Sequence, residues 1–217
     1  EHTFQSSNTS SDAIKFVGHS DNGRGLQLYG DVKIYATGAD GGITLESNGS
    51  TSSDYGIPLG AGGSTEILAH SGPIVLDVKQ ATGSIDLWIH SNVYLGSKSG
   101  TSVPTSVSDI TIRANLFNFS GYAPYVATSG TFTLEPVSTS TSFGQNVSTS
   151  WWNWNQNSQT LSGLTFGKSG GTRKITHTTD DITVNGTVNF YGGIIDLFAS
   201  LTTSGAVNAL ASDYIYI

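Results

Sequence analysis

The chain has 217 residues with a formal net charge of −7, and only 12% of the residues are charged whereas 36% are hydrophobic. Its nine lysines and arginines form no basic stripe, which argues against nucleic acid and anionic membrane surfaces as partners. Cysteine is absent, which excludes disulfides and thiolate metal sites. No apolar run approaches the roughly 18 residues of a membrane-spanning helix, so membrane insertion is not expected.

Short segments of alternating apolar and polar residues predict β-strands along the chain. In chain order, these segments lie at 14–17, 26–29, 32–35, 43–45, 74–78, 85–89 and 110–112. Glycine, asparagine, aspartate and serine separate them, as turns require. Helical spacing of apolar residues is not evident, so the sequence predicts an all-β protein.

Repetition of these segments predicts a solenoid. The pair at 32–34 and 43–45 aligns with the pair at 74–76 and 85–87 at an offset of about 42 residues, or two turns of about 21. Towards the end of the chain, apolar segments recur about every six to eight residues, which gives three strands in a turn of about 20. They lie at 182–184, 188–190 and 194–197, and then at Leu201, Val207 and Ile215.

We therefore expect a parallel β-helix of about 20 residues per coil over residues 1–217, with about ten coils and a length of about 50 Å. A β-sandwich is the alternative, but its strands usually run longer. Two stretches interrupt the repeat and predict excursions. Residues 48–64 are rich in glycine and serine, which predicts a loop that leaves the coil. Residues 136–159 hold a serine and threonine run before a tryptophan cluster, which predicts a larger excursion such as a lateral hairpin.

Three segments, at 130–136, 161–167 and 181–188, carry a family resemblance. Their cadence resembles the coils of filamentous-haemagglutinin-type exoproteins, the passengers of two-partner secretion, and it covers about 40% of the chain well. This resemblance implies a right-handed β-helix in a large, secreted, cysteine-poor and often adhesive protein. The Asn-Pro-Asn motifs of the family's secretion domain do not occur. An internal segment is therefore expected, and Glu1 in place of an initiator methionine indicates a processed or excised piece.

The tryptophan cluster is the main candidate binding site. Trp151, Trp152 and Trp154 are interleaved with Asn153 and Asn155. Indole faces stack on sugar rings and amides hydrogen-bond to hydroxyls, so this combination suits carbohydrate. The alternative is that the indoles pack a hairpin against the coil.

Other polar groups give weaker hypotheses. Asp180 and Asp181 are the one adjacent acidic pair, while Asp77 and Asp86 occupy corresponding places in successive predicted strands. A glycosidase needs two carboxylates about 5 to 9.5 Å apart, and neither set completes a catalytic site by sequence. His70 and His90 lie about one predicted coil apart and could stack as a zinc pair, but their spacing matches no metal motif. We predict no catalytic residues, no metal site and no cofactor.

These observations favour a structural or adhesive segment of a secreted bacterial surface protein: a stiff rod that presents loops and self-associates end to end or laterally. Glycans of host cells or matrix are the expected partners, and the expected location is the cell surface. The chain ends on an apolar strand at 214–217, so either further coils follow or copies stack end to end. The alternatives are a carbohydrate-binding module and a polysaccharide-degrading or tailspike β-helix.

Overall fold

The computed structural model describes residues 1–20, 25–49, 55–79, 85–154, 156–179 and 181–217. Within them the chain is all-β, and each strand pairing is parallel. Two short 3-10 helices, η1 (Thr149–Trp151) and η2 (Gln156–Ser158), complete the described structure. The arrangement is compatible with a parallel β-helix.

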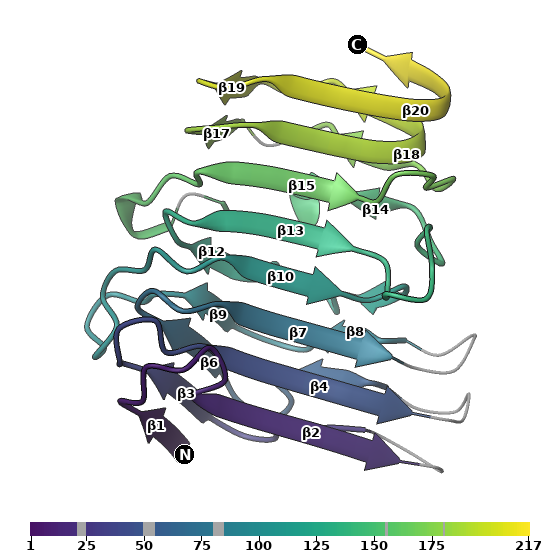
Figure 1. The fold of residues 1–217 in the computed structure, drawn as a ribbon. Helices are drawn as coiled ribbons and strands as arrows, with labels where there is room; N and C mark the ends of the chain where they lie inside the picture. Colours follow the sequence, from purple (N-terminus) through teal and green to yellow (C-terminus); the bar gives the residue numbers. More distant parts are fainter. Residues whose placement is uncertain (21–24, 50–54, 80–84, 155, 180) are drawn as a thin grey trace.

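The described strands form four sheets, whose members succeed one another up the stack in Figure 1. The largest contains β2 (Ile14–Ser20), β4 (Ile43–Gly49), β7 (Ile74–Lys79), β10 (Ile110–Arg113), β13 (Thr131–Glu135), β15 (Gly163–Gly167), β18 (Val188–Leu197), β16 (Ile175–His177) and β14 (Val147–Ser148) in that order, with β20 (Val207–Tyr216) paired to β18. The second contains β1 (His2–Ser6), β3 (Val32–Ala36), β6 (Thr65–Ala69), β9 (Val93–Gly96) and β12 (Tyr125–Ala127). The smaller two contain β5 (Ile57–Leu59), β8 (Leu87–Ile89) and β11 (Phe117–Asn118), and β17 (Ile182–Val184) with β19 (Leu201–Thr203).

The register shows that the predicted coil length is wrong for the first passes of the chain. Ile14 pairs with Ile43 and Ile43 pairs with Ile74, so these passes contain 29 and 31 residues. Val32 pairs with Thr65 rather than with a residue 42 positions later. Eight successive strands from β2 to β20 stack along one wall, and at about 4.8 Å per step they span about 34 Å, less than the predicted length.

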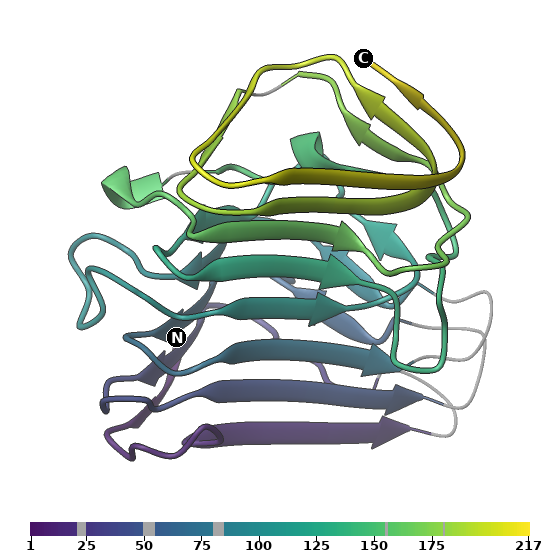
Figure 2. The same ribbon diagram turned by 45° about the horizontal axis from the view of Figure 1, so that its top comes forward.

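The last two passes do have the predicted length. Val188 pairs with Val207, 19 residues later. Here β18 and β20 are long strands that run through a corner of the coil, with a register shift between Gly192 and Ile194. Figure 2 shows the yellow β20 curving around this corner above β18. The coil is shorter here because the strand turns the corner without an intervening loop.

The core lies inside the stack, where each strand points alternate side chains inward. On the largest sheet, register aligns one inward position of every pass into a ladder, of which Ile43, Ile74, Ile110, Phe132 and Leu164 are consecutive buried members. Burial of each such side chain contributes roughly 1.5–3 kcal/mol. The continuous ladder explains why short strands suffice to hold the fold.

The segment at 136–159 was expected to leave the stack, but its backbone belongs to it. The Gly144 amide donates to the Asn115 carbonyl at 2.9 Å, one pass below. The Asn153 amide donates to Pro124 at 2.8 Å, and the Asn153 carbonyl accepts from Val126 at 2.9 Å. The segment is thus another pass of the coil and not a lateral hairpin.

The other predicted excursion, at 48–64, is also shorter than expected. Residues 50–54 lie outside the described residues, but β5 is part of the stack, and its Ile57 and Leu59 are fully buried. A real excursion, not predicted, joins β9 to β10 over residues 97–109. Its Val103 packs with Tyr35 and Leu68 on the outer side of the second sheet.

Candidate functional site

The tryptophan cluster divides between the core and the surface. Trp152 is 1% exposed and Trp154 is 7% exposed, and the ring of each meets the Phe132 ring at 5.0 Å. Both rings therefore pack the interior, as the alternative interpretation expected, and neither offers a face to a sugar. Trp151 is partly exposed, and Asn155 lies outside the described residues.

Strand-like alternation explains this division. Trp152 and Trp154 are two residues apart and point to the same side, whereas Asn153 between them points away from the core. The Asn153 side chain donates from Nδ2 to the Ala123 carbonyl at 2.9 Å. The Trp154 indole donates to the Thr149 carbonyl at 2.9 Å, but the buried Trp152 indole N–H has no acceptor in the described structure.

Two hollows flank this segment. The first, which we call the aromatic hollow, has a volume of about 240 Å³. Its lining residues are Phe119, Gly121, Tyr122, Ala123, Ser150 and Trp151. The second, the polar hollow, has about the same volume, and its lining residues are Trp152, Asn153, Trp154, Gln156 and Asp181. Because Trp151 and Trp152 are consecutive, the two hollows are one residue apart along the chain.

Phe119 and Tyr122 were not among the predicted site residues. The signal for them was present, since 117–122 holds three aromatic residues and a glycine in six positions. The Tyr122 amide donates to the Phe119 carbonyl at 3.0 Å and closes a tight turn. That turn brings both rings to the corner where Trp151 lies.

The acidic residues considered for catalysis do not converge. Asp77 lies on β7 and forms an ion pair with Lys79 at 3.3 Å. Asp86 directly precedes β8 in a different sheet and is buried, where its Oδ2 accepts from the Asn115 and Leu116 amides at 2.5 and 3.2 Å. The two carboxylates therefore do not face solvent on one side, as the sequence had indicated. Asp180 lies outside the described residues.

The histidines considered for zinc do not share a face either. His70 follows β6 of the second sheet, and its amide donates to the Ala36 carbonyl at 3.2 Å. His90 follows β8 of another sheet, where its ring lies 3.5 Å from that of Trp88. Over the described part of the chain, no group of three or more histidine and acidic side chains is placed to hold a metal ion.

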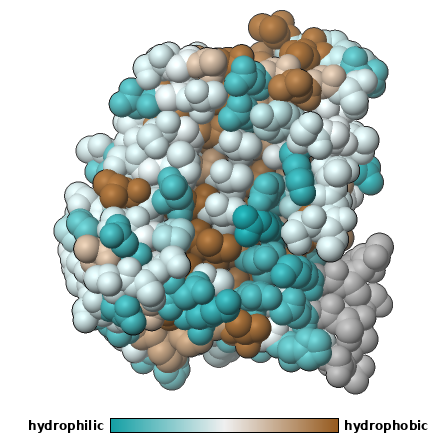
Figure 3. All heavy atoms as spheres, viewed as in Figure 1, coloured by the Kyte–Doolittle hydropathy of each residue, from teal (hydrophilic) through white to brown (hydrophobic). Residues whose placement is uncertain are grey.

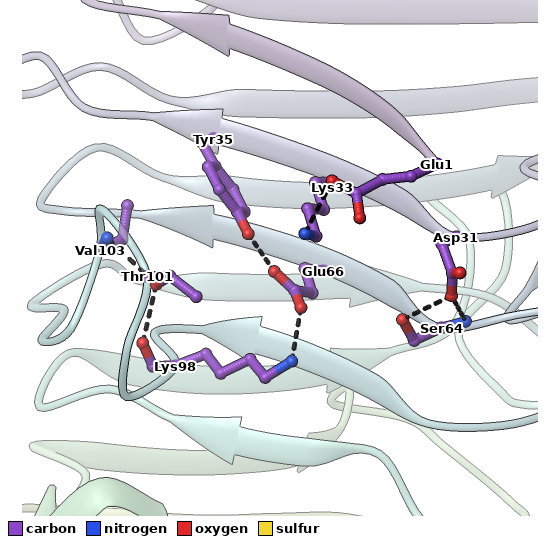
Figure 4. Close-up of polar contacts among 9 residues, drawn as sticks. All are labelled: Glu1, Asp31, Lys33, Tyr35, Ser64, Glu66, Lys98, Thr101 and Val103. Atoms are coloured by element: carbon purple, nitrogen blue, oxygen red, sulfur yellow. Dashed lines mark hydrogen bonds and ion pairs between the residues drawn. The ribbon is translucent and has the colours of Figure 1, made fainter.

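A buried charge network fastens the 97–109 excursion to the wall (Figure 4). Glu66 is 2% exposed; it accepts a hydrogen bond from the Tyr35 hydroxyl, and Lys98 donates to it at 2.5 Å. Lys98 also lies 4.2 Å from the centre of the Tyr94 ring. Burial, reinforced by the hydrogen bond to Glu66, raises the pKa of Tyr35 well above its ordinary value. The phenol stays protonated and the carboxylate is enclosed, so the network stabilises structure and does not present a catalytic base.

Comparisons with protein-family models, with curated proteins and with solved structures give no match. Among the described residues, no helix is long and apolar enough to cross a membrane. The function is therefore argued below from the chain's own residues.

Proposed function

We propose that this chain is a right-handed parallel β-helix segment of a large secreted bacterial surface protein of the filamentous-haemagglutinin type, where it forms a stiff, adhesive rod. The observation that carries the proposal is the interior ladder, which continues through successive passes of the largest sheet without a polar break. The right hand follows from the general preference of parallel crossover connections, about 98% of which are right-handed.

Stiffness follows from the way the passes are joined. Each inner strand hydrogen-bonds to the strand below and the strand above, so bending the stack requires breaking several ladders together. Outward charges reinforce the contact between passes. Arg113 and Glu135 face each other across β10 and β13, and the Arg113 Nε donates to the Glu135 carboxylate at 2.7 Å. Excursions such as 97–109 are then presented from a rigid wall.

A polysaccharide-degrading enzyme is supported less well. Glycoside hydrolysis needs two carboxylates about 5 to 9.5 Å apart on either side of a substrate. Asp77 is neutralised by Lys79, and Asp86 and Glu66 are enclosed by the protein. These acids hold the wall together, which is the role expected of them in a rod.

Adhesion of coated beads to cells tests the adhesive part of this proposal. Beads carrying the folded chain should attach to cultured epithelial cells in greater numbers than beads carrying the same chain after thermal unfolding. Beads carrying albumin give the background. Attachment at the albumin level by the folded chain would refute an adhesive role.

Homotypic stacking belongs to the same proposal. The last strand, β20, is unpaired on one side, and its Val207, Leu210 and Ile215 are exposed. Figure 3 shows apolar residues gathered over this end, at the top of the view. Long apolar edge strands readily pair with other strands. We expect a second copy to stack there, so that sedimentation shows dimers whose population falls on Leu210→Lys; a strict monomer at high concentration would contradict this.

A further inference from the structure

We propose that the aromatic hollow formed by Phe119, Tyr122 and Trp151 binds the C–H face of a neutral hexopyranose, and that the polar hollow beside it accepts the hydroxyls of the next sugar ring. This inference rests on the adhesive role proposed above and supplies its ligand class. It also shifts the binding residues from the buried indoles to the three rings at the corner of the coil.

The aromatic surface is both open and held in place. The Trp151 and Phe119 rings lie 5.0 Å apart with planes inclined by 41°. Behind them, Phe119 meets the buried Trp152 ring at 5.5 Å, so the core fixes the position of the exposed rings. Tyr122 is 48% exposed at the rim. A ligand would therefore meet aromatic faces that need no rearrangement, which lowers the entropic cost of binding.

The turn beneath the rings leaves room for a ligand. Gly121 has a φ of +83°, and no atom lies within 4 Å of the point where a side chain would begin. The backbone is therefore exposed between Phe119 and Tyr122. A hollow of about 240 Å³ at a turn suits a single ring better than a helix or an extended peptide, which need a groove along the wall.

The chemistry of the lining selects a neutral sugar. A pyranose has an apolar C–H face that suits an aromatic ring, and hydroxyls at its edge that need polar partners. Ser150 supplies a hydroxyl at the edge of the hollow, held 2.7 Å from the Ser148 hydroxyl. The six lining residues carry no formal charge, and the chain as a whole is at −7. Sialylated and sulfated sugars would gain no ion pair there and would be repelled by the chain.

An independent observation extends the site into the polar hollow. Trp152 lines that hollow, and its indole N–H is buried without an acceptor. A buried donor that lacks a partner costs roughly 1–3 kcal/mol, and a hydroxyl oxygen in the hollow would relieve that cost. Asp181 and the amides of Asn153 and Gln156 supply further polar groups around the same space. A disaccharide can therefore engage both hollows, whereas a monosaccharide fills one.

Saturation-transfer NMR and calorimetry test the proposal with the intact chain. The probes are methyl β-galactopyranoside, methyl β-glucopyranoside, lactose and 3′-sialyllactose. We expect saturation on the ring C–H protons of the neutral sugars and tighter binding of lactose than of either methyl glycoside. Tyr122→Ala should weaken lactose binding by about tenfold, because an aromatic contact is lost.

The controls separate binding from folding. Tyr29→Ala removes an equally large and more exposed ring outside the hollow, and it should leave the affinity unchanged. Trp151→Phe keeps an aromatic ring in contact with the core, and it should retain the fold and part of the affinity. Absence of neutral-sugar binding by the folded chain, or equal affinity of the Tyr122→Ala and parent chains, would overturn the site. Tighter binding of 3′-sialyllactose than of lactose would overturn the preference for a neutral ligand.

These results are distinguishable from failure of the proposed function. Cell attachment without sugar binding would sink this inference and leave the adhesive rod. Sugar binding without cell attachment would keep the site and refute the adhesive role.

Discussion

Replacement of Asp86 by asparagine should remove a pH-dependent loss of stability. Burial raises the pKa of the Asp86 carboxyl to about 6 from 3.8, and the bonds from the Asn115 and Leu116 amides offset only part of this rise. The folded state then binds the proton more tightly than the unfolded state. The stabilisation from this group is therefore complete below about pH 4 and is lost as the pH rises through 6.

The magnitude follows from the size of the shift. A difference of about two pKa units corresponds to roughly 3 kcal/mol in the free energy of unfolding between pH 4 and pH 7. Asparagine retains the carbonyl oxygen that accepts from Asn115 and Leu116 but carries no charge. Asp86→Asn should therefore be more stable than the parent chain at pH 7, and about equal to it at pH 4. Asp86→Ala leaves both amides without their acceptor and should be destabilised by about 1–3 kcal/mol.

Urea unfolding followed by tryptophan fluorescence provides the assay, at pH 4.0, 5.5 and 7.5 with a constant ionic strength. The quantity to compare is the difference in unfolding free energy between the parent and Asp86→Asn chains at each pH. A difference that does not change with pH would show that Asp86 does not titrate in this range. A parent chain that gains stability over the variant as the pH rises would show that the two amide bonds outweigh burial, and it would refute the reasoning.

Three further changes test how the coil is held together. Phe166→Ala should destabilise the chain by about 3–5 kcal/mol, because it leaves a cavity in the interior ladder; a urea midpoint close to that of the parent would contradict the packing. Lys98→Met leaves the enclosed Glu66 carboxylate without its cation and should cost about 3 kcal/mol. It should also speed amide hydrogen exchange in 97–109, and unchanged exchange would show that the network does not hold this excursion. Gly167→Ala should lower the melting temperature, since φ is +86° and the added carbon would lie 2.0 Å from a backbone oxygen; a neutral result would mean that the turn can relax.

Strand positions were predictable because the alternation of apolar residues is a local property. The segments at 32–35, 43–45, 74–78 and 110–112 all lie on strands of the structure. The pairing partners were not predictable in the same way. Strands of the different sheets share one pattern, so 32–34 resembles 74–76 as well as its true partner at 65–67. Only the register shows which strands belong to one wall.

Coil length failed for a related reason. At the C-terminal end, β18 turns the corner as one strand, and the spacing of apolar residues equals the coil. In the earlier passes, loops separate the walls, and the apolar spacing within a wall says nothing of their length. The excursion at 97–109 was missed because Val103 is its one buried apolar anchor in the second cluster. The network that fixes it joins residues from three separate segments, Tyr35, Glu66 and Lys98, which no local pattern connects.

The tryptophan cluster shows where function can reside on such a wall. Within a pass, inward positions are committed to the interior ladder, and Trp152 and Trp154 occupy them. A ring becomes available to a ligand only where the backbone turns a corner and alternation is interrupted. Trp151 ends η1 at such a corner, and the Phe119–Tyr122 turn of the pass below brings two more rings beside it. The binding residues are thus set by stacking between passes, which is why a cluster that is continuous in sequence divides into a packed half and an exposed half.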